Sequence, residues 1–265
     1  MYLKRKADAY LNAWKSDPNR SPLIIKGPRQ VGKTETIDYF AAHNYRSVVE
    51  INFVEEPKYR AITADGYGAD TIVRNISLID PAKKFIPGDT LIFFDEIQAH
   101  PDIATALKFF KIDGKYDVIC SGSMLGISYK QIESNSVGYK TDYEMRSLDF
   151  EEFLWARGYD EAVIESMFTH LCDATPFSEV EMNVFSTAFM DYCVLGGMPA
   201  VVASHIRTGT FEGTLQLQRQ LILDYQEDIR KYAQGLDQAR ILNVFNHIPV
   251  QLAKENKKFQ ISKVA

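Results

Sequence analysis

The stretch 21–35 combines a short apolar run, two glycines, and a lysine followed by a threonine. It reads SPLIIKGPRQVGKTE, and Gly27 to Thr34 fit the pattern G-x-x-x-x-G-K-[ST] in full. Glycines let the main chain turn so that successive amide groups point inward at an anion. The pattern therefore predicts a phosphate-binding loop between a buried strand at 22–25 and a helix at 33–42. The alternative is a glycine turn ahead of an ordinary helix.

The lysine and the threonine indicate which phosphates bind. Lys33 opens the helix, so its ammonium group and the amino end of the helix both favour β and γ phosphates. Thr34 presents a hydroxyl where a bound Mg²⁺ needs an oxygen ligand. We expect ATP and Mg²⁺ as cofactors, with binding residues Gly27, Pro28, Arg29, Gln30, Val31, Gly32, Lys33, Thr34 and Glu35.

A second candidate group is the acid pair Asp95 and Glu96, which follows the apolar run 90–94. Side chains of neighbouring residues on a strand diverge, so two adjacent acids can serve different partners. We expect Asp95 to hold the metal or its water shell, and Glu96 to orient and polarise the attacking water. The alternative is a solvated pair at the end of a strand.

Two hydroxyls end the next predicted strand, 115–123, whose middle is apolar. We expect Ser121 or Ser123 to sense the γ phosphate or fix the attacking water, and spacing alone does not choose between them. The alternative is a Ser-Gly-Ser turn that satisfies its own backbone.

Composition limits the classes to which the chain can belong. Its 265 residues include 46% hydrophobic and 25% charged residues, as in globular proteins, and carry a net charge of −5. The negative charge argues against a surface built wholly for nucleic acid. With neither a signal-peptide core nor a long apolar run, we expect a cytoplasmic protein without a membrane span. Three cysteines without a C-x-x-C pair and five scattered histidines predict neither a zinc site nor thiol catalysis.

The elements that position these groups alternate between strand and helix in the first part of the chain. Further strands are expected at 47–53 and 143–148, whereas 71–79 fits either a helix or a strand. After about residue 158 only helical periods remain. We therefore expect an α/β fold with a parallel sheet, followed by an all-helical region. The expected helices are 2–15, 101–110, 150–156, 161–172, 179–195, 201–204, 214–232 and 238–254.

The last residues suggest the start of a further motif. Helix 238–254 is followed by a lysine-rich turn and by Ser262, which resembles an N-cap with almost no helix after it. This order predicts a shortened helix-turn-helix segment, and its lysines either meet phosphates or form a solvated face.

Five stretches carry a family resemblance: GPRQVGKT, LIFFDEIQ, DVICSGSMLG, RSLDFEEFLWA and YCVLGGMPAVV. In this order the chain resembles prokaryotic AAA-type P-loop ATPases with an uncharacterised carboxy-terminal region. The resemblance implies a sheet of strand order 5-1-4-3-2, a helical lid, a winged helix and a nuclease-like fold. On this basis we expect a P-loop ATPase domain at 1–160, a lid at 161–236, and a truncated winged-helix segment at 237–265.

One feature departs from the family pattern. Many relatives carry Gly-Arg near 138–140, where this chain has no arginine. Arg146, on the strand expected at 143–148, is our candidate arginine finger. Arg207 and Arg230 are weaker candidates, and a surface ion pair is the alternative for each.

Two functions remain open. The first is an Mg²⁺-dependent ATPase whose cycle moves the lid and tail. The second is a nucleotide-gated switch with little turnover that acts through a protein or DNA partner. A homo-oligomer would complete an AAA-type site. A small-molecule kinase is disfavoured because no arginine-rich substrate lid is evident, and GTP because the nearest N-K-x-D candidate, 256–259, ends in phenylalanine.

Overall fold

The computed structural model describes residues 1–123, 136, 138–232 and 236–254. Contacts group the chain into two compact units, Met1–Gly209 and Thr210–Ala265. The strands are β1 (Leu23–Gly27), β2 (Ser47–Asn52), β3 (Thr90–Asp95), β4 (Asp117–Ser123) and β5 (Thr141–Glu144). The helices of the first unit are α1 (Lys6–Ser16), α2 (Lys33–Asn44), α3 (Ala69–Ile79), α4 (Ile103–Asp113), α5 (Phe150–Ala156), α6 (Glu161–Asp173), α7 (Glu179–Leu195) and α8 (Pro199–Thr208), with short 3₁₀ turns η1 (Pro57–Thr63) and η2 (Ile97–Ala99).

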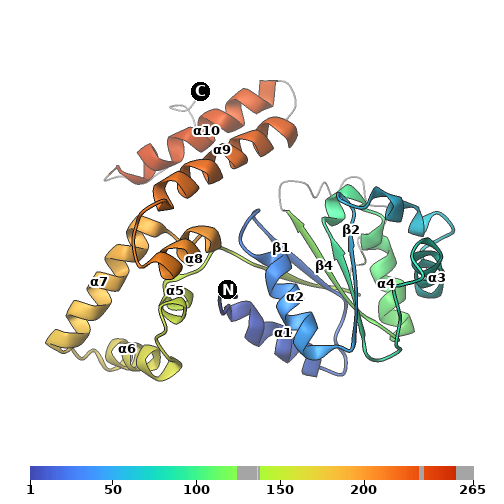
Figure 1. The fold of residues 1–265 in the computed structure, drawn as a ribbon, viewed down its shortest axis with the longest axis horizontal. Coiled ribbons are helices and arrows are strands. Elements are labelled where there is room, and N and C mark those ends of the chain that lie inside the picture. The colour runs from blue at the N-terminus through green and yellow to red at the C-terminus, as the bar shows by residue number, and fades with distance from the viewer. Residues whose placement is uncertain (124–135, 137, 233–235, 255–265) are drawn as a thin grey trace. The chain divides into compact units, whose positions relative to one another are not determined.

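The five strands form one parallel sheet in the order β2-β3-β4-β1-β5 (Figure 1). This is the expected order 5-1-4-3-2, and it confirms the α/β class. Because all strands are parallel, their carboxyl ends lie at one edge of the sheet. The register places Gly27 beside Ser123 and Asn52 beside Asp95 at that edge.

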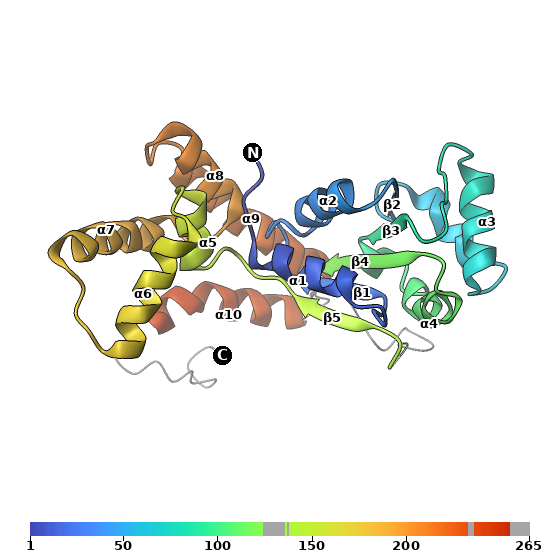
Figure 2. The same ribbon diagram turned by 90° about the horizontal axis from the view of Figure 1, so that it is seen from below.

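Both faces of the central strands β1, β3 and β4 are buried, which explains why these strands are largely apolar. Alternate residues of each strand point to opposite faces. On one face, Ile92 and Phe94 pack with residues of α3 and α4. On the other, Leu91 and Phe93 pack with residues of α1 and α2. Figure 2 shows α2 and α4 on opposite sides of the strands.

The stretch 71–79, which fitted either element, is part of α3. Ile72 and Ile76 are one helical turn apart and both are fully buried in the core. Strand β5 also differs from expectation, because it covers Thr141–Glu144 and not 143–148. It pairs with β1 on one side only, and its last paired residue is Glu144, opposite Lys26.

Helices α5 to α8 belong to the same unit as the sheet. A capping box between Asp149 and Glu152 starts α5, as the sequence indicated. The backbone of Leu148 donates to the Gly197 carbonyl at 2.7 Å and accepts from the Tyr192 hydroxyl at 2.8 Å. These bonds tie the start of α5 to the end of α7 and the start of α8.

The second unit contains two described helices, α9 (Thr214–Tyr232) and α10 (Leu236–Leu252). Tyr225 packs against Phe245, and Gln226 donates to Asn246 at 3.0 Å. The two helices therefore pack on each other. Ser262 and the expected end of the helix-turn-helix segment lie outside the described residues. The domain ranges 1–160, 161–236 and 237–265 stay a prediction.

None of the described helices is both long and apolar enough to cross a membrane.

Candidate nucleotide-binding site

The loop between β1 and α2 has the backbone shape that an anion cradle requires. Gly32, the N-cap of α2, has φ 89° and ψ 23°, in the left-handed region that favours glycine. Gln30 also has a positive φ of 62°. Pro28, Gln30 and Glu35 are exposed, Arg29 is half-buried, and Val31 packs into the core. The side chains of Pro28, Gln30 and Glu35 therefore do not belong to the core beneath the loop.

Gly27 is needed for a reason that the motif does not reveal. A Cβ atom at this position would overlap the carbonyl oxygen of Met145. Met145 comes directly after β5 and donates its backbone N–H to the Lys26 carbonyl at 2.7 Å. The glycine therefore lets the chain that follows β5 approach the start of the loop.

Lys33 reaches back across the loop. Its Nζ atom donates to the carbonyls of Pro28 at 2.7 Å and Gly27 at 3.1 Å. Burial lowers the pKa of Lys33, while the charges of Glu96 and Asp95 act in the opposite direction. An anion in the loop would stabilise the charged ammonium that burial disfavours.

Asp95 lies at the centre of the site, with 4% of its surface exposed. Its Oδ2 atom accepts from Thr34 Oγ1 at 3.2 Å and from Asn52 at 3.3 Å. Its Oδ1 atom accepts from the Ser121 hydroxyl and from the backbone of Glu96. The structure thus joins the ends of β2, β3 and β4 to the first turn of α2.

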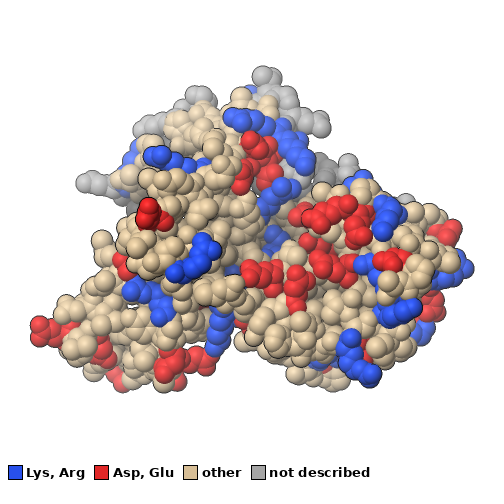
Figure 3. Space-filling model, in the orientation of Figure 1, with Lys and Arg blue, Asp and Glu red and all other residues tan. Residues whose placement is uncertain are grey.

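More carboxyl groups surround this point. Acidic side chains gather over the part of the sheet region where α2 and β2 lie (Figure 3). Burial raises the pKa of Asp38, helped by Asp95 and Glu35, and burial together with Asp38 and Asp95 raises the pKa of Glu50. A cation beside Asp95 would relieve this repulsion.

Glu96 is held in a special position. Its φ of 55° and ψ of 46° lie in the left-handed region, which is uncommon for a residue other than glycine. Its carboxylate accepts from Gln98, and the Gln98 side-chain oxygen accepts from the backbone of Ser123 at 3.3 Å. Gln98 therefore links the predicted water-activating acid to the end of β4.

The two serines of β4 have different surroundings. The hydroxyl of Ser121 donates a hydrogen bond to Asp95, whereas the hydroxyl of Ser123 is buried without a hydrogen-bond partner among the described residues. Ser123 is paired in register with Gly27, the first glycine of the loop. A buried hydroxyl without a partner beside the loop fits a bound group that supplies the missing hydrogen bond.

Arg5, just before α1, was not singled out from the sequence. Its guanidinium group donates to the carbonyls of Val31 at 2.7 Å and Arg146 at 2.6 Å, and it lies 3.1 Å from the Glu152 carboxylate. Both side chains of this ion pair are buried. Arg5 therefore connects the loop to the segment between β5 and α5.

Arg146 does not lie on a strand, because β5 ends at Glu144. Its side chain is 77% exposed and forms an ion pair with Glu144 at 3.1 Å. This is the surface pair that the sequence left open as an alternative. Its role as an arginine finger stays a prediction.

Asn52 and Gln98 were also missed, although each left a signal in the sequence. Asn52 is the polar residue that ends an otherwise ordinary strand, and Gln98 follows the acid pair by two residues. Only the pairing of β2 with β3 and the turn η2 bring these amides to the carboxylates.

Residues 19–154, half of the chain, match the family described as AAA domain. The chain belongs to this family. Its AAA domain thus comprises the sheet, the phosphate loop and Asp95–Glu96. Residues 186–265 match a domain of unknown function, so the family comparison assigns no activity to the helices beyond the AAA domain.

Solved structures similar to this AAA protein include PCH-2 of C. elegans and AMPPCP-bound DnaA from Aquifex aeolicus. PCH-2 is 10% identical, with a TM-score of 0.37, over 98% of this chain and 64% of the PCH-2 chain. DnaA is 14% identical, with a TM-score of 0.43, over 99% of this chain and 82% of the DnaA chain. The chain thus spans less than two thirds of PCH-2. No curated protein matches the sequence.

Proposed function

We propose that this AAA domain binds ATP with Mg²⁺ and hydrolyses it by attack of water on the γ phosphate. The observation that carries the proposal is the 3.2 Å contact between Thr34 Oγ1 and Asp95 Oδ2. The two residues come from distant parts of the sequence, and both offer oxygen atoms of the kind that Mg²⁺ prefers.

Each group has a defined part in this proposal. The loop amides and Lys33 would bind the β and γ phosphates, with Lys33 exchanging its carbonyl partners for phosphate oxygens. Thr34 and Asp95 would hold Mg²⁺ or its water shell. Glu96 would accept the proton of the attacking water, and Ser123 would donate to that water or to the γ phosphate. Bound Mg²⁺ would neutralise charge that develops on the phosphate oxygens.

The first test is binding of a fluorescent ATP analogue to the wild type and to Lys33→Ala. We expect the variant to lose detectable binding and to keep its circular dichroism spectrum and melting temperature within about 3 °C. The fold should survive because the hydrogen bonds that the Lys33 ammonium makes to described residues, Gly27 and Pro28, both lie within the loop. Retained affinity in a folded variant would show that the loop is not the site.

A second function, a nucleotide-gated switch with little turnover, is favoured by the contact between Gln98 and Glu96. An acid held by an amide is less available to activate water. Phosphate release by the wild type and by Glu96→Gln separates the two functions. Hydrolysis predicts a loss of about 100-fold in the variant, whereas equal, near-zero rates support the switch.

We further propose that a neighbouring copy in a homo-oligomer supplies the cation that would complete this site, with Arg146 as the candidate. The exposure of Arg146 supports a contact made outside its own chain. Its replacement by alanine should lower phosphate release without changing ATP affinity. Mass in solution, measured with and without ATP and Mg²⁺, tests the assembly. A DNA or protein partner of the carboxy-terminal region also stays a proposal.

A further inference from the structure

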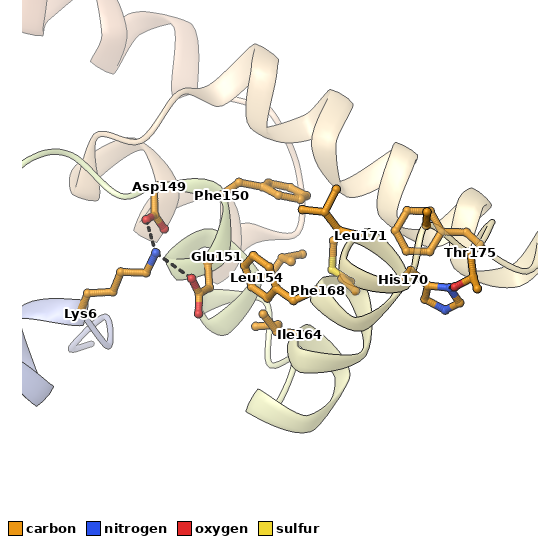
Figure 4. A pocket seen from close by; sticks show the side chains of 13 residues that line it. Lys6, Asp149, Phe150, Glu151, Leu154, Ile164, Phe168, His170, Leu171 and Thr175 are labelled. Atoms are coloured by element: carbon orange, nitrogen blue, oxygen red, sulfur yellow. Dashed lines mark hydrogen bonds and ion pairs between the residues drawn. The ribbon is translucent and has the colours of Figure 1, made fainter.

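A second concave site lies in the helical part of the first unit. It is a cavity of about 750 Å³ between α5, α6 and the segment that leads to α7 (Figure 4), and we call it the α5–α6 pocket. It contains no residue of the phosphate loop, nor Asp95 or Glu96. Its apolar wall includes Leu154, Ile164, Met167, Phe168, Leu171 and Phe177.

One face of α6 forms much of this wall. Ile164, Met167, Phe168 and Leu171 follow the spacing i, i+3, i+4, i+7, so they form a single ridge. Ile164 is buried against α5, but Phe168 is 50% exposed and Leu171 is 77% exposed. The ridge is therefore only partly covered, and its spacing suits the groove of another helix.

The charges at the rim are dominated by acids. Among the described residues that line the pocket, the lysine is Lys6, which pairs with Asp149 at 2.5 Å and with Glu151 at 2.6 Å (Figure 4). Residues 149–195 contain ten acidic residues and one basic residue, Arg157. Three cations from the start of the chain, Lys4, Arg5 and Lys6, pair with acids of this range, and the group with these cations included has a net charge of −6. Arg157 is itself paired with Asp191. An occupant of the pocket therefore meets an apolar ridge within a negative field.

We propose that the α5–α6 pocket binds an amphipathic helix of a partner protein whose apolar face is flanked by lysine or arginine. The apolar face would cover the ridge of α6, and the basic flanks would face the surrounding carboxylates. Helices α9 and α10 do not fit this description, because the acidic and basic residues within each are equal in number. Nucleic acid does not fit either, since its phosphates would be repelled.

The pocket also adjoins the groups that hold the phosphate loop. Lys6 donates its backbone N–H to Glu152, the ion-pair partner of Arg5, and Arg5 contacts the Val31 carbonyl. A helix bound at the rim would therefore shift ATP affinity or turnover. This consequence rests on the proposed function, whereas docking itself does not.

The test uses the full chain without nucleotide and a fluorescein-labelled 18-residue peptide of leucine and lysine with helical amphipathic spacing. Two control peptides match it: one in which glutamate replaces lysine, and one with the same composition in scrambled order. We expect fluorescence anisotropy to give a Kd of about 1–50 μM for the first peptide, at least about tenfold tighter than for either control.

Protein variants locate the binding. Leu171→Asp should weaken binding of the basic peptide at least about tenfold. Glu165→Lys, which changes an exposed residue on the same helix, should weaken this binding at least about threefold. The control is Leu78→Asp on α3, where the leucine is 72% exposed, and it should leave the affinity unchanged. Circular dichroism checks that all three variants are folded.

Three results would overturn the proposal. The first is equal binding of the basic and glutamate peptides, and the second is equal weakening by Leu171→Asp and Leu78→Asp. The third is self-association that Leu171→Asp abolishes while no peptide binds, which would assign the pocket to a second copy of this chain. None of these readouts depends on ATP hydrolysis.

Discussion

Two serines that occupy similar positions in the sequence have different hydrogen-bonding states. Ser121 donates to Asp95, and Ser123 has a buried hydroxyl without a partner among the described residues. We predict that Ser123→Ala lowers single-turnover phosphate release about 10- to 100-fold and changes ATP affinity less than about threefold. The hydroxyl would contribute mainly where charge develops in the reaction.

The matched control is Ser121→Ala. It removes a donor to the proposed metal-holding carboxylate, so we expect it to raise the Mg²⁺ concentration that half-saturates turnover. Identical effects of the two substitutions on both quantities would mean that the two hydroxyls do not have separate functions.

The site residues that the sequence predicted are those set by local spacing. Lys33 and Thr34 follow a glycine loop, and Asp95 follows an apolar run, so the contact between Thr34 and Asp95 could be expected before any coordinates. The role of Arg5 could not be expected from the sequence, because the carbonyls that accept its hydrogen bonds are 26 and 141 residues away. The choice between Ser121 and Ser123 depended on a hydrogen bond between different strands, which spacing does not specify.

At the level of elements, the buried pair Arg5–Glu152 connects the start of α1 to α5 and the loop. We predict that Glu152→Gln lowers the free energy of unfolding by about 3–5 kcal/mol, because it leaves the buried Arg5 charge without its counter-charge. Denaturant unfolding at neutral pH measures this change.

The control is Glu161→Gln, which breaks the exposed pair with Lys4. Solvent screens exposed pairs, so the expected loss is below about 1 kcal/mol. Similar losses of unfolding free energy in the two variants would show that the buried charge of Arg5 does not need Glu152 as its counter-charge.

His100, at the end of η2, is the residue through which we expect pH to affect stability. Its ring packs on Phe53, and its Nε2 atom lies 3.0 Å from the Thr63 hydroxyl. Burial lowers the pKa of His100 below its ordinary value of 6.5, Asp102 opposes this and Arg60 adds to it. Below about pH 6.5 the unfolded chain binds a proton that the folded chain does not, so the free energy of unfolding falls as pH falls.

We predict that the wild type loses more stability than His100→Gln between about pH 7.5 and 5.5. The difference should approach at most about 1.4 kcal/mol per pH unit below the unfolded pKa. Urea unfolding of both proteins at the two pH values measures it, and the comparison cancels carboxylates common to both. Equal losses would mean that His100 titrates alike in the folded and unfolded chains.

Helices and strands were predictable where the length of a segment and the spacing of its apolar residues indicated the same type of element. The central strands and the capping box of α5 follow directly from their patterns. Residues 71–79 were undecided because β-branched residues favour a strand while Ile72 and Ile76 have helical spacing, and packing against the sheet decides for a helix. The limits of β5 depend on its pairing with β1, which no local pattern specifies.

At the scale of the whole molecule, the change in pattern near residue 158 does not coincide with a break in contacts. The contacts divide the chain after Gly209. The reason is that α5 packs with α6 and α7, and Leu148 bonds to Tyr192 and Gly197. Local periodicity reports which element forms, whereas a boundary depends on which elements share a core.

This difference gives a prediction about truncation. The described hydrophobic clusters of the sheet and of α5–α7 all lie before Gly209, so residues 1–209 should fold alone and melt in one cooperative transition. We expect their ATP affinity to be within about threefold of that of the full chain, an effect below about 0.7 kcal/mol. Residues 1–160 should aggregate or melt at least about 10 °C lower, because the cut exposes Phe153, which packs against the tilted ring of Tyr192. Calorimetry and analogue binding measure both. If residues 1–160 proved as stable as residues 1–209, α6–α8 would form a separate lid, and the boundary indicated by the change from alternating strands and helices to helices alone would be the correct one.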